Sequence, residues 1–189
     1  MSVAASLPSG DRRTELDFDH VYQQNLRFVW RALVASGVPE WRLEDAAQDV
    51  FAAVHARLGE FEGRSKLTTW LYGIARHVAL DHIRKAARER RRARELFVKV
   101  GAGEGAPSSP EEEVGAAQAR RLLLDLLDRI QPTLREVFVL VELEQVPVRE
   151  VAAMLAIKEN TAWSRLRLAR AEFERQVARV RARDEEGSR

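Results

Sequence analysis

Residues 148–167, VREVAAMLAIKENTAWSRLR, show the clearest helical pattern of this chain. An apolar helix over Val148 to Leu155 is followed by a tight turn over Ala156 to Asn160 and by a second helix. Asn160 or Thr161 is expected to cap that second helix. This pattern is typical of a helix-turn-helix, whose second helix enters the major groove of DNA, and a plain helical hairpin is the alternative.

The second helix of this motif carries the positive charge that a DNA-binding helix needs. Residues 161–181 contain six arginines and two glutamates, a local charge of +4. The side chains expected to point outward near the groove are Trp163, Ser164, Arg167 and Arg170. Charge and helix pattern together predict DNA binding.

The rest of the chain is also patterned for helices. Apolar residues recur every three or four positions over residues 18–33, 43–58, 67–78, 114–127 and 133–143, and no segment alternates as a strand would. The stretch GAGEGAPSSP has the composition of a linker. We therefore predict an all-α fold with a disordered N-terminus (1–15), a helical domain (16–96), a flexible linker (97–112), a second helical domain (113–180) and a disordered tail (181–189).

The first predicted domain ends in a dense basic segment. RKAARERRRAR, residues 84–94, holds seven basic residues and one acid. Arg84 and Arg88 share a helical face that can follow phosphates, although a solvated helix end gives the same pattern. Just before it, FEGRSKLTTWLY, residues 61–72, mixes cations with aromatic rings. Cations beside aromatic rings can bind unstacked single-stranded bases. The alternative is that these rings are partly buried in the core.

A negative face precedes these segments. Residues 40–62 contain six acids and two arginines. Four side chains project away from the apolar stripe of the predicted helix: Asp45, Gln48, Asp49 and Ala52. Such a face can dock a basic helix of a partner or simply improve solubility.

Composition argues against several other classes of function. The chain has 189 residues, a net charge of +2 and no cysteine, so disulfides and thiolate chemistry are excluded. The four histidines lack metal-ligand spacing, and no phosphate-binding glycine loop occurs. No enzyme, cofactor or metal is expected. Without an evident signal peptide or a long apolar run, we expect a cytoplasmic protein.

Three stretches carry a resemblance to a known family. They are EDAAQDVFAAVHARL (residues 44–58), FEGRSKLTTWLYGIARHVALDHIRKAARERR (61–91) and QPTLREVFVLVELEQVPVREVAAMLAIKENTAWSRLRLAR (131–170). In this order, and with this linker, the chain resembles a sigma-70 family factor of the extracytoplasmic-function type, group IV. The resemblance implies a sigma-2 helical bundle followed by a sigma-4 helix-turn-helix bundle. It also implies three partners: core RNA polymerase, promoter DNA in duplex and melted form, and an anti-sigma factor.

The resemblance implies a role for each motif. Polymerase core binding would fall on the motif Asp45 to Leu58, with Asp45, Gln48, Asp49 and Ala52. Recognition of the −10 element would fall on Arg64, Lys66, Thr68, Thr69, Trp70, Arg76, Arg84 and Arg88. Recognition of the −35 element would fall on the helix-turn-helix Val148 to Arg167, with Asn160, Trp163, Ser164, Arg165, Arg167 and Arg170.

The last helix departs from the family pattern. Such helices often have GTVKSRLHRAR, whereas this chain has NTAWSRLRLAR, so Trp163 and Leu168 stand where cations are usual. We therefore expect Ser164 and Arg167 to contact bases, with Arg165 and Arg170 on phosphates. Two other functions fit the residues: a stand-alone helix-turn-helix regulator, and a helical adaptor for an acidic protein.

Overall fold

The structure is a computed structural model that describes residues 17–100 and 114–187. Within these ranges the regular elements are all helical, which confirms the predicted class. In order they are α1 (Phe18–Ser36), the 3-10 turn η1 (Glu40–Arg42), α2 (Leu43–Arg57), the 3-10 turn η2 (Leu58–Glu60), α3 (Leu67–Val100), α4 (Val114–Asp128), α5 (Pro132–Phe138), the π turn η3 (Val139–Leu143), α6 (Val148–Met154) and α7 (Glu159–Gly187). The predicted disordered N-terminus and most of the predicted linker lie outside the described residues.

Helices α1, α2 and α3 form the first domain around the predicted apolar stripes. Leu33, Val50 and Leu71 are fully buried, one from each helix. Helix α1 ends at Gly37, whose φ of +92° is a left-handed conformation that favours glycine. A Cβ atom at Gly37 would also lie only 2.7 Å from Nη2 of Arg135, which belongs to α5. The backbone conformation therefore favours glycine here, and a larger residue would also have to displace the end of the Arg135 side chain.

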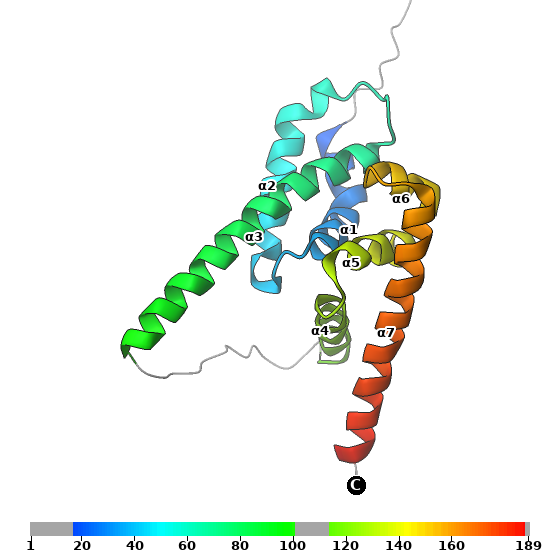
Figure 1. The fold of residues 1–189 in the computed structure, drawn as a ribbon. Helices are drawn as coiled ribbons and strands as arrows, with labels where there is room; N and C mark the ends of the chain where they lie inside the picture. The colour runs from blue at the N-terminus through cyan, green and yellow to red at the C-terminus, as the bar shows by residue number, and fades with distance from the viewer. Residues whose placement is uncertain (1–16, 101–113, 188–189) are drawn as a thin grey trace, which may run out of the picture.

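Helix α3 is the longest element and projects beyond α2 at its outer end (Figure 1). It continues to Val100, past the predicted domain end at residue 96. Helix α7 likewise continues to Gly187, through most of the segment predicted as a disordered tail. Both extensions follow from composition, because arginine, glutamate and alanine are favourable in helices even where they bury little.

Helices α4 to α7, with the π turn, form the second domain. Leu140, Val151 and Leu166 are buried at its centre. The predicted turn before the last helix is present, with Ala156 in a left-handed conformation. The predicted caps are wrong, because α7 already begins at Glu159 and the amides of Thr161 and Ala162 bond to the carbonyl of Lys158.

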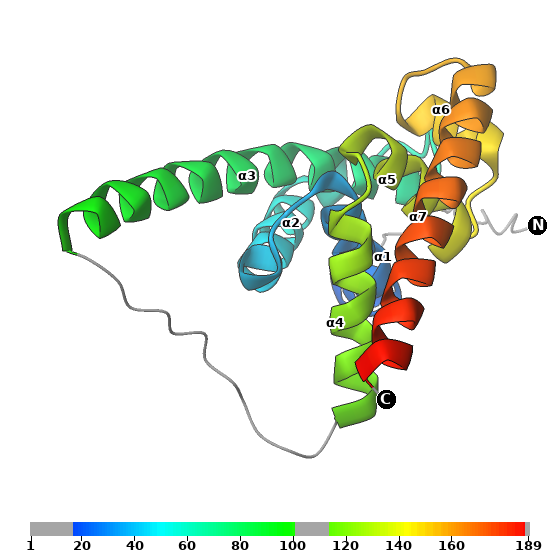
Figure 2. The ribbon, with the colours of Figure 1, turned by 60° about the horizontal axis from the view of Figure 1, so that its bottom comes forward.

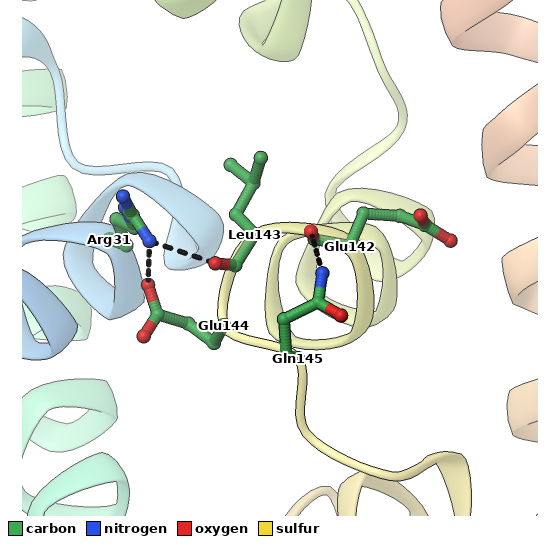
Figure 3. Close-up of polar contacts among 5 residues, drawn as sticks. All are labelled: Arg31, Glu142, Leu143, Glu144 and Gln145. Atoms are coloured by element: carbon green, nitrogen blue, oxygen red, sulfur yellow. Dashed lines mark hydrogen bonds and ion pairs between the residues drawn. The ribbon is translucent and has the colours of Figure 1, made fainter.

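The two domains pack against each other, a contact that sequence periodicity did not predict. Helix α1 lies against α5 and the π turn, and one continuous cluster of buried apolar residues includes side chains from both domains. At its edge, Nη1 of Arg31 lies 2.8 Å from both the carbonyl oxygen of Leu143 and Oε1 of Glu144 (Figure 3). In Figure 2, α4 and α7 run beside each other while α3 extends away from them.

Candidate nucleic-acid interface

The outer half of α3 presents its basic side chains to solvent. Arg84 and Arg88 are exposed on the face opposite the buried Leu71 stripe, together with His77. Asp81 accepts a hydrogen bond from Arg84 at 3.3 Å, an exposed contact within one helical turn. Such a pair contributes little to stability, so both guanidinium groups are available to an external anion.

The segment that leads into α3 contains both cationic side chains and aromatic rings. The rings of Phe61 and Trp70 lie 5.3 Å apart between centroids, and both side chains are half-buried. The ring of Trp70 thus packs partly on the core, as the alternative interpretation held, and the residue remains partly exposed. Arg64 is exposed and pairs with Glu62, while Thr68 and Thr69 are half-buried in the first turn of the helix.

Two further cations of the predicted −10 set contact the second domain. Nζ of Lys66 lies 2.5 Å from Oε2 of Glu150 in α6. Nε of Arg76 donates to Oε1 of Glu136 in α5 at 3.4 Å, and the hydroxyl of Tyr72 donates to the same oxygen at 3.3 Å. Burial raises the pKa of the Tyr72 hydroxyl, and the charge of Glu136 raises it further, so the phenol remains a donor.

The predicted acidic face of α2 is present. Asp45, Gln48, Asp49 and Ala52 are exposed together, at the spacing of one helical face. Asp49 also has an internal partner, because its Oδ2 lies 2.8 Å from Nε2 of the buried His82. This pair was not predicted from the sequence, although His82 continues the apolar spacing of α3 by one turn after Val78.

The predicted −35 side chains at the start of α7 do not all lie on one exposed face. Asn160, Trp163, Ser164 and Arg167 are exposed on one face. The hydroxyl of Ser164 donates to the carbonyl oxygen of Asn160 at 2.9 Å, which leaves its oxygen free to accept.

The two arginines expected on phosphates differ in their surroundings. Arg170 borders the exposed face of α7 but is held by Glu142 through bonds of 2.8 and 2.6 Å. Arg165 lies on the opposite side of the helix and is half-buried, so it does not share this surface.

Other kinds of site find no support in the described ranges. No group of three or more histidine, aspartate or glutamate side chains is placed to hold a metal ion within residues 17–100 and 114–187. None of the helices in those ranges is long and apolar enough to cross a membrane.

Comparison with known proteins identifies both halves of the molecule. Residues 21–89 match the family model of sigma-70 region 2, which covers α1, α2 and most of α3. Residues 120–173 match the model of sigma-70 region 4, which covers the second domain up to the middle of α7. The basic faces of α3 and α7 thus lie in two different regions of one family.

Relatives and solved structures agree with this assignment. The chain is 28% identical over 154 residues to the sigma-E factor of Escherichia coli, covering 77% of this chain and 79% of that protein. It is 26% identical over 180 residues to the sigma factor SigM of Mycobacterium tuberculosis, covering 92% and 82%. The fold resembles that of RpoE from Bartonella quintana, solved with the anti-sigma factor NepR, with a TM-score of 0.61, 20% identity and coverage of 86% and 97%. CnrH, solved with the cytosolic domain of CnrY, gives the same TM-score and identity over 90% and 91%. The chain belongs to the sigma-70 family as a sigma factor of the extracytoplasmic-function group, which directs promoter-specific transcription.

Proposed function

We propose that this protein is a non-catalytic subunit that joins core RNA polymerase in the cytoplasm and selects promoters through both domains. The first domain binds and opens the −10 element, and the second binds the −35 element as a duplex. The observation that carries this proposal is the presence of two basic helix faces, one in each matched region of the family. We propose residues 16–96 and 113–180 as the limits of the two functional units.

For the −10 element, the proposal divides the residues by the chemistry they offer. Arg84 and Arg88 contact phosphates, because they are exposed guanidinium groups on one face. The partly exposed ring of Trp70 is the aromatic group on which an unstacked base can stack. The remaining members of the proposed site, which surround that ring or continue the helix face, are Arg64, Lys66, Thr68, Thr69 and Arg76.

For the −35 element, Ser164 and Arg167 contact base edges from the exposed start of α7. Asn160 and Trp163 complete this face. Arg170 reaches a phosphate once it leaves Glu142. Arg165 belonged to the predicted set, but its half-buried position on the opposite side supports a structural role better than a DNA contact.

The α2 face docks the polymerase core. Of its two carboxylates, Asp45 has no internal partner among the hydrogen bonds and ion pairs of the described residues, whereas Asp49 holds His82. Asp45→Arg is therefore the simpler test of docking: we expect weaker binding to core polymerase with a stability loss of only about 1 kcal/mol, because Asp45 lies in the first turn of α2, where the helix dipole favours a negative charge. Asp49→Arg is the informative contrast, because it should lower stability further by removing the partner of His82.

An anti-sigma protein is proposed as a further partner, since both similar structures were solved with a bound protein. An open groove of about 1020 Å³ lies between α1, α2 and α4, with Leu26, Trp30 and Leu123 in its wall. Exposed apolar surface of this kind marks interaction sites, so we place the anti-sigma segment there. Leu26→Asp should abolish its capture while leaving transcription with core polymerase intact.

The decisive experiment is transcription in vitro with purified core polymerase on genomic DNA, followed by mapping of RNA 5′ ends. We expect start sites that share upstream elements and that vanish without this protein. A stand-alone regulator would instead bind duplex DNA tightly without polymerase, which a gel-shift assay with and without core enzyme measures. Absence of both core binding and specific transcripts would refute the proposal.

A further inference from the structure

Trp41 is an exposed tryptophan that lies just before α2. It belongs to the 3-10 turn η1, and 56% of the residue is accessible to solvent. Within the described part of the chain, it is neither in the buried core nor among the residues packed against that core. Tryptophan is one of the largest apolar side chains, so this ring leaves much apolar surface available to a partner.

The ring is restrained although it is exposed. The guanidinium carbon of Arg42 lies 4.7 Å from the centre of the Trp41 ring, which is the geometry of a cation–π contact. Arg42 is itself anchored, because its Nη2 atom bonds the carboxylate of Glu89 in α3 and its side chain is only 12% exposed. A restrained ring loses less conformational freedom on binding than a mobile one, which makes it an effective anchor of an interface.

The charges around Trp41 indicate which kind of partner it can meet. Glu40, Glu44 and Asp45 are exposed within four residues of the ring. The neighbouring cation, Arg42, already has a carboxylate partner. This negative environment repels the phosphates of a nucleic acid. It favours a protein surface that has an apolar pocket beside basic side chains, since interfaces commonly place an aromatic residue at the centre and charges at the rim.

Trp41 is continuous with the acidic face of α2 that we propose for docking to core polymerase. The turn η1 ends at Arg42 and α2 begins at the next residue, so Trp41 lies about one helical turn before Asp45. The groove proposed for the anti-sigma segment is lined by other described residues, among which Trp41 does not occur. The position of the ring therefore favours the polymerase as its partner.

We propose that Trp41 is the apolar anchor of the polymerase-docking surface: its ring enters an apolar pocket of core polymerase, while Asp45 meets basic side chains at the rim of that pocket. This inference rests on the proposed docking role of the α2 face and adds an apolar contact to it. The contact with Arg42 keeps the ring in place before the polymerase binds.

The test measures the affinity of full-length variants for purified core polymerase without DNA. Leu80→Ala is the control for Trp41→Ala, because Leu80 is an apolar residue of the same domain that is 44% exposed. We expect Trp41→Ala to bind about 10- to 100-fold more weakly than wild type, as the loss of an anchoring tryptophan typically does, and Leu80→Ala to bind as wild type does. Trp41→Phe keeps a ring and should recover part of the affinity. Both alanine variants should unfold close to the wild-type temperature, since surface substitutions change stability little.

Two further measurements separate an anchor from a residue that only supports the fold. Hydroxyl-radical footprinting of the wild-type chain should show that oxidation of Trp41 falls when core polymerase binds, and it decides the question even if a substitution lowers stability. The affinity loss of Trp41→Ala should persist in high salt, whereas that of Asp45→Arg should shrink, because salt screens charges but not apolar contacts. Equal affinities of Trp41→Ala and Leu80→Ala, or unchanged oxidation of Trp41 in the complex, would overturn the anchor.

The behaviour of the wild-type protein separates this inference from the proposed function. If wild-type protein binds core polymerase and initiates at promoters but Trp41→Ala binds as tightly, the anchor fails and the sigma function stands. If wild-type protein neither binds core polymerase nor supports specific transcripts, the proposed function fails and the anchor fails with it.

Discussion

Helices α3 and α7 carry the two basic faces of the molecule, and they differ in how their cations are held. Along α3, the inner cations contact carboxylates of the other domain, while Arg84 and Arg88 are exposed. Along α7, Arg167 is exposed and Arg170 is held by Glu142 of its own domain. The cations of the two helices therefore differ in which of them are free to bind an external anion. Lys66 and Arg76 of the first domain pair across the domain boundary, whereas Arg170 pairs within its own domain.

The largest effect is expected from weakening the apolar packing that joins the two domains, to which α3 and α7 belong. Leu140 of the π turn is fully buried in the cluster shared by both domains. Leu140→Ala should lower the free energy of unfolding by about 2–5 kcal/mol, because a buried cavity replaces the side chain. Because the cluster is continuous, thermal unfolding followed by circular dichroism should show one transition that shifts as a whole.

Leu122→Ala is the control for this prediction, since Leu122 is 42% exposed. Its effect on unfolding should stay within about 0.5 kcal/mol. If Leu140→Ala splits the unfolding curve into two steps, the domains are energetically independent and the α3 surface is not coupled to the second domain.

The next effect separates phosphate contacts on α3 from base contacts on α7. Arg84→Gln with Arg88→Gln should weaken binding to all promoters alike. For the polymerase-bound factor on duplex promoters, it should reduce the slope of log affinity against log salt by about 1.8, or 0.9 for each lost phosphate. Arg167→Gln should instead cost about 1–3 kcal/mol at promoters with the preferred −35 base and little elsewhere. Equal losses on all sequences for Arg167→Gln would remove its assignment to base contacts.

A smaller effect concerns Trp163, which stands on α7 where the family pattern has a cation. Trp163 is 51% exposed and is not among the residues that form or pack against the core in the described part of the chain. Trp163→Ala should therefore leave stability within about 0.5 kcal/mol and shift −35 preference by about 1 kcal/mol, the size of a weak mismatch. Trp163→Lys, which returns the family's charge, should raise affinity for non-specific duplex DNA. Loss of stability comparable with that of Leu140→Ala would show that the ring is structural.

Sequence periodicity correctly predicted which side chains share an exposed face within a single helix. The exposed set Asp45, Gln48, Asp49 and Ala52 follows from the spacing of α2, and the set around Trp163 and Arg167 follows from that of α7. In both cases local geometry alone decides which side chains share a face.

Contacts between residues far apart in the sequence produce no periodic pattern from which they could be predicted. Glu136 and Glu150 occur in helices that the sequence showed only as apolar stripes, and their partners lie 60 and 84 positions away. Buried Arg135 is partly a similar case, because it bonds Leu127 and Asp128 of its own domain but also lies close to Gly37 of the other. Which cations of α3 are covered is therefore a property of domain packing and could not be obtained from any single segment.

The smallest effect concerns the contact that anchors the outer half of α3. Arg42 of η1 hydrogen-bonds Glu89, and this bond holds the pKa of the Glu89 carboxyl below its usual 4.5. A carboxyl with a lowered folded-state pKa stabilises the fold above its unfolded pKa, and the contribution is lost as the pH falls through the folded value. Glu89→Gln should therefore lower the melting temperature slightly at neutral pH, and the difference from wild type should shrink below about pH 4.5. Because Glu89 is exposed, the shift should also shrink in high salt. A difference that persists in acid would mean that Glu89 acts through packing and not through its charge.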